Sequence, residues 1–164
     1  MKKLLVILAM ALAVVVANAT ENSGRFKVGV GMLYENGLDL TVGYEIEGAD
    51  HNMWEFFANG YVKWAECATC GHVCPDSFWK NYRTWGVGAA YKPCVCRGRN
   101  NYGNIRVGAS LGSDTHSVLG GIHAGYEHSF VLRHDWALFL GAKVDLMIKG
   151  EDVFRTGIVA GIKF

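Results

Sequence analysis

The sequence has little charge and, beyond its first residues, no long apolar run. Only 19% of its 164 residues are charged, against roughly 25% in ordinary soluble domains. The 16 basic and 15 acidic residues nearly cancel, which excludes a nucleic-acid binder recruited by a strongly basic surface. After residue 19 no run reaches the ~20 apolar residues of a transmembrane helix. The chain is instead rich in Gly (21 residues) and aromatic residues (12%), so it is either very well buried or surrounded by lipid.

The N-terminus predicts the compartment. Lys2 and Lys3 precede the apolar run 4–16, which is followed by Ala17, Asn18 and Ala19. A charged start, a short apolar segment and an A-x-A site are typical of a cleaved signal peptide. We therefore expect a signal peptide over 1–19 and one barrel domain over 20–164, with a retained membrane anchor as the alternative.

The rest of the chain alternates between apolar and polar residues. In segment 38–47, for example, Leu38, Leu40 and Val42 lie on one face, and Asp39 and Thr41 on the other. A period of two predicts a strand. Eight such segments of about ten residues predict an all-β fold, an eight-stranded antiparallel up-and-down β-barrel.

The polarity of the two faces favours a transmembrane barrel over a soluble one. Small and charged residues share one face and suit a narrow lumen, whereas aromatic residues lie near strand ends on the apolar face, and the chain ends on the apolar Phe164. We expect an outer-membrane protein without a conducting pore; a soluble periplasmic barrel carrying an apolar ligand stays open. The predicted lumen charges are Lys27, Asp39, Glu45, Glu55, Lys63, Arg106, Glu127, Lys143, Asp145 and Arg155.

Five cysteines fall in two groups. Cys67, Cys70 and Cys74 lie in the loop 65–80, and Cys94 and Cys96 lie in the connection 93–103 that is predicted after the fourth strand. Secretion favours disulfides among the five, although an odd number cannot all pair within one chain. With a periplasmic N-terminus the two groups lie on opposite sides of the membrane, so any bridge in the first group is predicted to be local. The alternative is a tetrahedral zinc site of Cys67, Cys70, His72 and Cys74.

The sequence predicts no catalytic site, no cofactor, no small-molecule substrate and no direct contact with nucleic acid. His116–Ser117 and His128–Ser129 are adjacent in sequence, and adjacent strand residues point to opposite faces, so neither pair is placed as base and nucleophile. A barrel enzyme or lipid-binding protein acting on envelope lipids remains the alternative function.

Several patches resemble a known family. Segments 54–59, 67–72, 77–82, 91–94 and 154–164 resemble the TraO-type transfer proteins of Bacteroides-type conjugative transposons. The resemblance covers most of residues 20–164 and carries no catalytic residues. It implies a structural or interaction component of the conjugative DNA-transfer apparatus, in contact with outer-membrane lipid and with other envelope or mating-apparatus proteins. We expect the partner contact in the loop 65–80, at Phe78 and Trp79.

Overall fold

The computed structural model describes residues 24–34, 36–67, 69–78, 81–114, 116–133 and 136–164. The predicted signal peptide over 1–19 and the first residues of the predicted barrel domain lie outside this range. Both boundaries therefore stay predictions.

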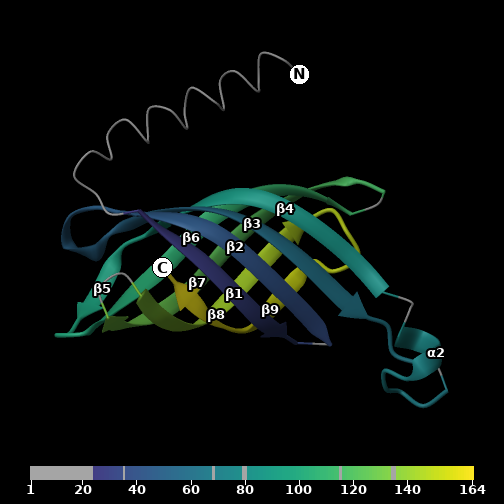
Figure 1. Ribbon diagram of the computed structural model, residues 1–164. Helices are drawn as coiled ribbons and strands as arrows, with labels where there is room; N and C mark the ends of the chain where they lie inside the picture. The colour runs from purple at the N-terminus through teal and green to yellow at the C-terminus, as the bar shows by residue number, and fades with distance from the viewer. Residues whose placement is uncertain (1–23, 35, 68, 79–80, 115, 134–135) are drawn as a thin grey trace.

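The described chain is almost entirely β-structure (Figure 1). Its helical segments are single turns, the 3-10 turn η1 (Ala49–His51) and α2 (Pro75–Phe78). The strands are β1 (Gly24–Leu33), β2 (Gly37–Glu47), β3 (Met53–Trp64), β4 (Asn81–Lys92), β5 (Cys94–Arg97), β6 (Asn101–Asp114), β7 (Val118–Arg133), β8 (Trp136–Ile148) and β9 (Phe154–Lys163).

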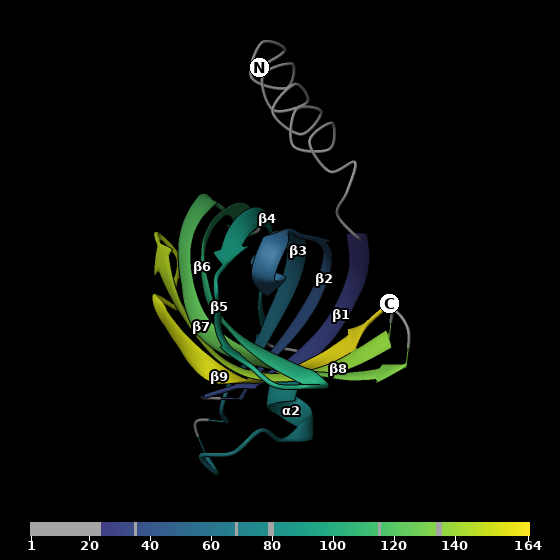
Figure 2. The same ribbon diagram turned by 90° about the vertical axis from the view of Figure 1, so that its left-hand side faces the viewer.

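The nine strand segments form one closed barrel of eight strands (Figure 2). All pairings are antiparallel, and β1 pairs with β9 to close the wall. Both β4 and β5 pair with β6, so together they occupy one place in the wall, interrupted at Pro93, which has no N–H to donate. The predicted fold is confirmed. The sequence predicted only a connection over 93–103, and the structure instead has β5 there, extending the hairpin with β6.

The register turns the apolar residues outward and the charges inward. Along β2, Leu38, Leu40 and Val42 are exposed, whereas Asp39 and Glu45 are each only 1% exposed. The other strands follow the same pattern, with exposed Val107 and Ile122 and buried Arg106 and His123 as examples. The interior is thus polar, the opposite of a soluble barrel that carries an apolar ligand.

Aromatic side chains gather on the outside near the rim that holds the chain ends. Phe26 and Phe164 join β1 to the C-terminus through two backbone hydrogen bonds, and their rings stack at 6.2 Å. Trp136 stacks on Phe164 at 5.4 Å, and Trp54 lies 5.1 Å from Tyr91. Exposed Trp and Tyr rings at one level of the wall are typical of a membrane interface.

Glycine makes room for large side chains inside the barrel. Phe139 is 2% exposed, and its ring lies over the paired Gly29 and Gly161, where a Cβ added at either position would come within 2.7 Å of it. The high glycine content therefore reflects lumen packing as well as turns.

Candidate functional site

The centre of the lumen holds an ion cluster built from seven strands. Glu127 accepts hydrogen bonds from Lys27 at 2.5 Å, from Lys163 at 2.6 Å and from Lys92. Glu45 pairs with Lys163 at 2.9 Å and with Lys92. Each of these side chains is nearly or fully buried, so the cluster ties distant strands together in a low-dielectric interior.

A third carboxylate completes this cluster. The Glu55 carboxylate accepts hydrogen bonds from Arg106 at 2.9 Å and from Lys27 at 3.2 Å. One oxygen atom from each of Glu45, Glu55 and Glu127 lies within 4.8 Å of the others, a spacing that could suit a cation. The ammonium and guanidinium groups already neutralise these carboxylates, so the cluster is an ion-pair network rather than a metal centre.

The structure places nine of the ten predicted lumen charges in the interior. The tenth, Lys63, lies at the rim with its side chain 26% exposed and pairs with Asp152 at 3.2 Å. The prediction omitted Lys92 and Lys163, which are both fully buried in the central cluster. Their position in the alternation marks the lumen face, and that signal could have identified them.

A second polar group lies further along the lumen. Lys143 bridges Asp39 and Asp145, each at 2.9 Å. Asp145 also contacts Nδ1 of His123 at 2.7 Å, and Nε2 of His123 contacts the Ser110 hydroxyl at 2.6 Å. Sequence reasoning missed this chain of contacts because its members come from four different strands.

Ser110, His123 and Asp145 have the hydrogen-bond order of a Ser–His–Asp triad. All three are buried, and the ring of Phe57 packs edge-on against His123 at 5.3 Å. A Cβ added at Gly121 would lie 2.8 Å from the Ser110 hydroxyl, so the space beside it is already narrow. We interpret the three residues as part of the interior hydrogen-bond network, since a nucleophile must be reachable by its substrate.

The lumen is closed by side chains. A cavity of about 30 Å³, lined by Lys27, Arg106 and Phe139 among others, has room for one or two water molecules. Toward one rim Arg155 lies over the Tyr61 ring at 3.8 Å, and Tyr61 donates to Asp152. Toward the other rim the Tyr102 ring stacks on His51 at 4.8 Å. These contacts place large side chains in the described lumen toward both rims.

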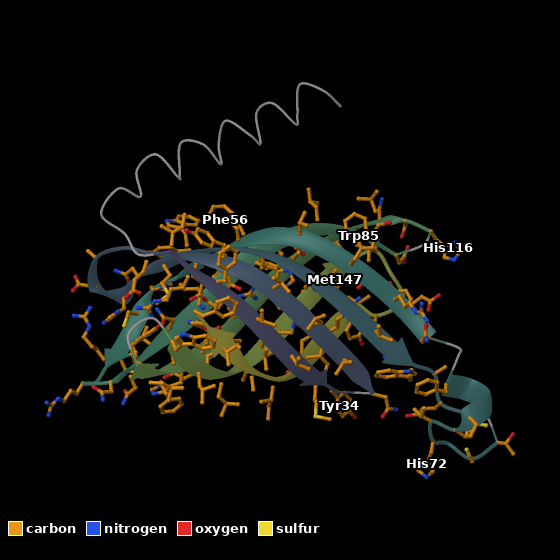
Figure 3. The ribbon with its side chains drawn as sticks, viewed as in Figure 1. Tyr34, Phe56, His72, Trp85, His116 and Met147 are labelled. Carbon is orange, nitrogen blue, oxygen red and sulfur yellow. The ribbon has the colours of Figure 1, made fainter. Side chains whose placement is uncertain are left out.

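The described part of the cysteine loop, residues 65–80, projects from the rim opposite the start of β1 and the C-terminus (Figure 1). The sulfur atoms of Cys67, Cys70 and Cys74 all lie within 4.8 Å of one another. His72, the fourth residue of the predicted zinc set, is not among them, and Figure 3 shows its ring at the outer edge of the loop, directed away from the ribbon.

The aromatic part of the cysteine loop folds back on the barrel. Phe78 is 44% exposed and stacks on Trp64 at a ring distance of 6.0 Å. A surface depression of about 430 Å³ lies beside it, lined by Phe78, Trp64, Val73 and residues of the β1–β2 hairpin. Trp79, the other predicted contact residue, lies outside the described residues.

The second cysteine group lies at the far end of the molecule, because β5 and α2 occupy opposite ends in Figure 1. Cys94 contacts the Cys96 carbonyl at 3.3 Å, and Cys96 contacts the Tyr126 hydroxyl at 3.4 Å. A bond between the two groups would have to span the length of the barrel, which a disulfide cannot do. A local bridge within the first group stays a prediction.

The Cys67 thiol is activated by its loop. Backbone N–H groups of Thr69 and Cys70 donate to its sulfur, and side-chain hydrogen bonds with Cys74 and Cys70 add to them, lowering the pKa of Cys67 to about 6. Hydrogen bonds to a charged sulfur favour the thiolate, the reactive form of cysteine.

This pKa predicts how fast Cys67 is alkylated in the reduced, folded protein. The iodoacetamide rate at Cys67 should reach half its maximum near pH 6, because the thiolate is protonated and unreactive below that pH. Peptide mass spectrometry at several pH values measures the rate. In urea-unfolded protein the midpoint should return to about 8.5, the ordinary value. The same midpoint in both states would contradict the assignment.

In the described part of the chain, no helix is both long and apolar enough to cross a membrane. No family model and no curated protein matches the sequence. The TraO-type resemblance therefore gains no support from these comparisons.

The fold does have counterparts among solved structures. The crystal structure of neisserial surface protein A (NspA) matches with a TM-score of 0.63 at 13% identity, over 85% of this chain and 94% of that one. A de novo designed transmembrane β-barrel matches with a TM-score of 0.51 at 13% identity, over 86% and 92%. The solution structure of the designed barrel TMB2.3 matches with a TM-score of 0.55 at 10% identity, over 87% of this chain and 93% of that one. The chain thus has the fold of a small outer-membrane-type β-barrel.

Proposed function

We propose that this protein is a structural and interaction component of the outer membrane that acts through its cysteine loop, and that it serves a conjugative DNA-transfer apparatus. The barrel anchors the chain in lipid, and the loop contacts another envelope or mating-apparatus protein. The apparatus itself is inferred from the TraO-type resemblance.

The membrane location is supported by the distribution of polarity. An apolar wall, an aromatic level near the chain ends and a charged interior suit a barrel whose outside faces lipid. This protein fills much of its interior with buried side chains such as Tyr61, Tyr102 and Phe139. Its function is therefore expected outside the lumen.

The observation that carries the proposal is the shape of the cysteine loop. It is the largest connection at its rim and presents the exposed ring of Phe78 next to Trp64 and Val73. Partly exposed aromatic side chains around a shallow depression are typical anchors of protein–protein contacts. With a periplasmic N-terminus, this loop lies at the cell surface.

Replacing residues 65–80 with a short Gly/Ser turn should reduce the frequency of conjugative transfer at least tenfold and leave the barrel intact. The reason is that the loop lies outside the paired strands, so its loss removes the contact surface alone. Mating assays measure transfer, and migration of unboiled samples on gels reports the folded barrel. A matched control replaces the turn 98–100 at the opposite rim, which lies between β5 and β6, with Gly and Ser. Unchanged mating with the 65–80 replacement would refute the loop's role.

A further inference from the structure

The cysteine loop brings three sulfur atoms together by means of its own backbone. The chain turns back at Gly71, whose φ of +68° is one that residues with a side chain rarely adopt. The Gly71 N–H donates to the Cys67 carbonyl at 2.9 Å, and the Cys67 N–H donates to the His72 carbonyl at 3.0 Å. This turn presents Cys67 and Cys70 on the same side.

The third sulfur, that of Cys74, lies in the second half of the loop. The Phe78 N–H donates to the Cys74 carbonyl at 2.9 Å, forming the single turn of α2, and the Phe78 ring stacks on Trp64 at the end of β3. Trp64 directly precedes the loop, so this stacking brings the two ends of the loop together. Cys74 then lies next to Cys67 and Cys70. All three sulfurs then lie within 4.8 Å of one another.

We propose that Cys67, Cys70 and Cys74 form a three-thiolate binding site for a thiophilic cation such as Zn²⁺. Around Zn²⁺ with Zn–S bonds of ~2.3 Å, the sulfurs of a tetrahedral site are about 3.8 Å apart. The observed spacing therefore needs a contraction of at most about 1 Å, which exposed cysteine side chains can supply by rotation.

The site differs from the four-ligand zinc site considered from the sequence. The His72 ring lies outside the sulfur cluster. The backbone carbonyl of His72 instead accepts a hydrogen bond from the Cys67 N–H. Three protein ligands leave the fourth position to water, and Cys70 is the most exposed of the three. The N–H groups of Thr69 and Cys70 that donate to the Cys67 sulfur hold a ligand thiolate in place before the metal arrives.

Binding involves no electron transfer. Each sulfur donates an electron pair to Zn²⁺, and the thiols that are still protonated release their protons to the buffer. Acid therefore opposes binding, and a disulfide between any two of the cysteines abolishes it.

The test uses full-length mature protein folded in detergent, reduced and freed of reductant under anaerobic conditions. One Zn²⁺ per chain is expected by native mass spectrometry, and Co²⁺ added in its place should give thiolate-to-metal charge-transfer absorption. Cys70→Ser and Cys74→Ser should weaken Zn²⁺ binding by more than about 100-fold, since even the loss of an outer-shell partner costs 10–100-fold.

Two matched controls separate this site from other donors. His72→Ala should leave the affinity unchanged within about twofold, because its ring is not a ligand. Cys94→Ser, at the opposite end of the barrel, should do the same. Gel migration of unboiled samples checks the fold of each variant. Blocking the thiols of folded wild-type protein with methyl methanethiosulfonate should abolish binding, and reduction should restore it.

Failure to retain Zn²⁺ in the reduced protein overturns the proposal, as does wild-type affinity in Cys70→Ser. Loss of binding in His72→Ala would also overturn the three-sulfur site.

Discussion

Replacing Glu127 with Gln should destabilise the barrel by about 3–5 kcal/mol, the cost of breaking a buried ion pair. The Glu127 carboxylate accepts hydrogen bonds from three lysines of the central cluster, Lys27, Lys92 and Lys163. Its amide substitute would leave their charges in a buried interior with only Glu45 and Glu55 to balance them. Urea unfolding in detergent or lipid vesicles, followed by tryptophan fluorescence, measures the change.

Asp50→Asn is the matched control, because it removes the same charge from an ion pair in water. Asp50 pairs with Arg97 at 3.2 Å, and their side chains are 79% and 48% exposed. An exposed pair contributes less than about 1 kcal/mol. Adding Lys163→Gln to Glu127→Gln should recover part of the loss, since it removes one unbalanced lysine. Equal effects of Glu127→Gln and Asp50→Asn would show that the central cluster does not stabilise the fold.

Replacing Val42 with Arg should cost about 2–4 kcal/mol if the outer face of the barrel lies in lipid, as for a cation at the bilayer midplane. Val42 lies mid-strand in β2, points outward with 47% exposure, and is flanked by Val28 and Ala58. On a water-exposed surface the same change would stay within about 0.5 kcal/mol. Unfolding from lipid vesicles and the amount of folded protein in outer-membrane fractions both report the effect.

Ile148→Arg supplies the control for depth. Ile148 also points outward, with 60% exposure, and is the last residue of β8. Near the membrane interface an arginine costs only about 0–1 kcal/mol. Similar small losses for both variants, together with recovery of the protein in the soluble periplasm, would exclude the transmembrane location.

The face of each strand could be predicted from the sequence because alternation is local. Asp39, Glu45 and Val42 take their sides from neighbours two residues away, without any knowledge of the fold. The same reasoning gave the number of strands in the barrel and the polar interior. It failed at residues 93–103, where Pro93 marks a break that the chain crosses by starting β5.

Which charges meet in the lumen could not be predicted, because pairing depends on register between strands. His123 lies opposite Asp145 across β7 and β8, and near Ser110 across β6 and β7. A slip of one residue would turn each of these side chains to the outside, and nothing local to one strand fixes that register.

In the cysteine loop, too, the sequence predicted the candidate residues and the tertiary structure decided which of them meet. The spacing of Cys67, Cys70 and Cys74 made a metal site or a local disulfide possible, and the sequence could not choose between His72 and other groups as a ligand. Only the folded loop decided that three sulfurs converge while the His72 ring points away.

By itself, then, the sequence determined a strand-built chain with one apolar face and one charged face, since side-chain alternation needs no long-range contact. The tertiary structure decided which residues are partners. Closure of β1 on β9 places Lys27 and Lys163 around Glu127, and the stacking of Phe78 on Trp64 returns Cys74 to Cys67. The first contact joins residues from opposite ends of the chain and needs the closed barrel, whereas the second needs the loop folded back onto β3.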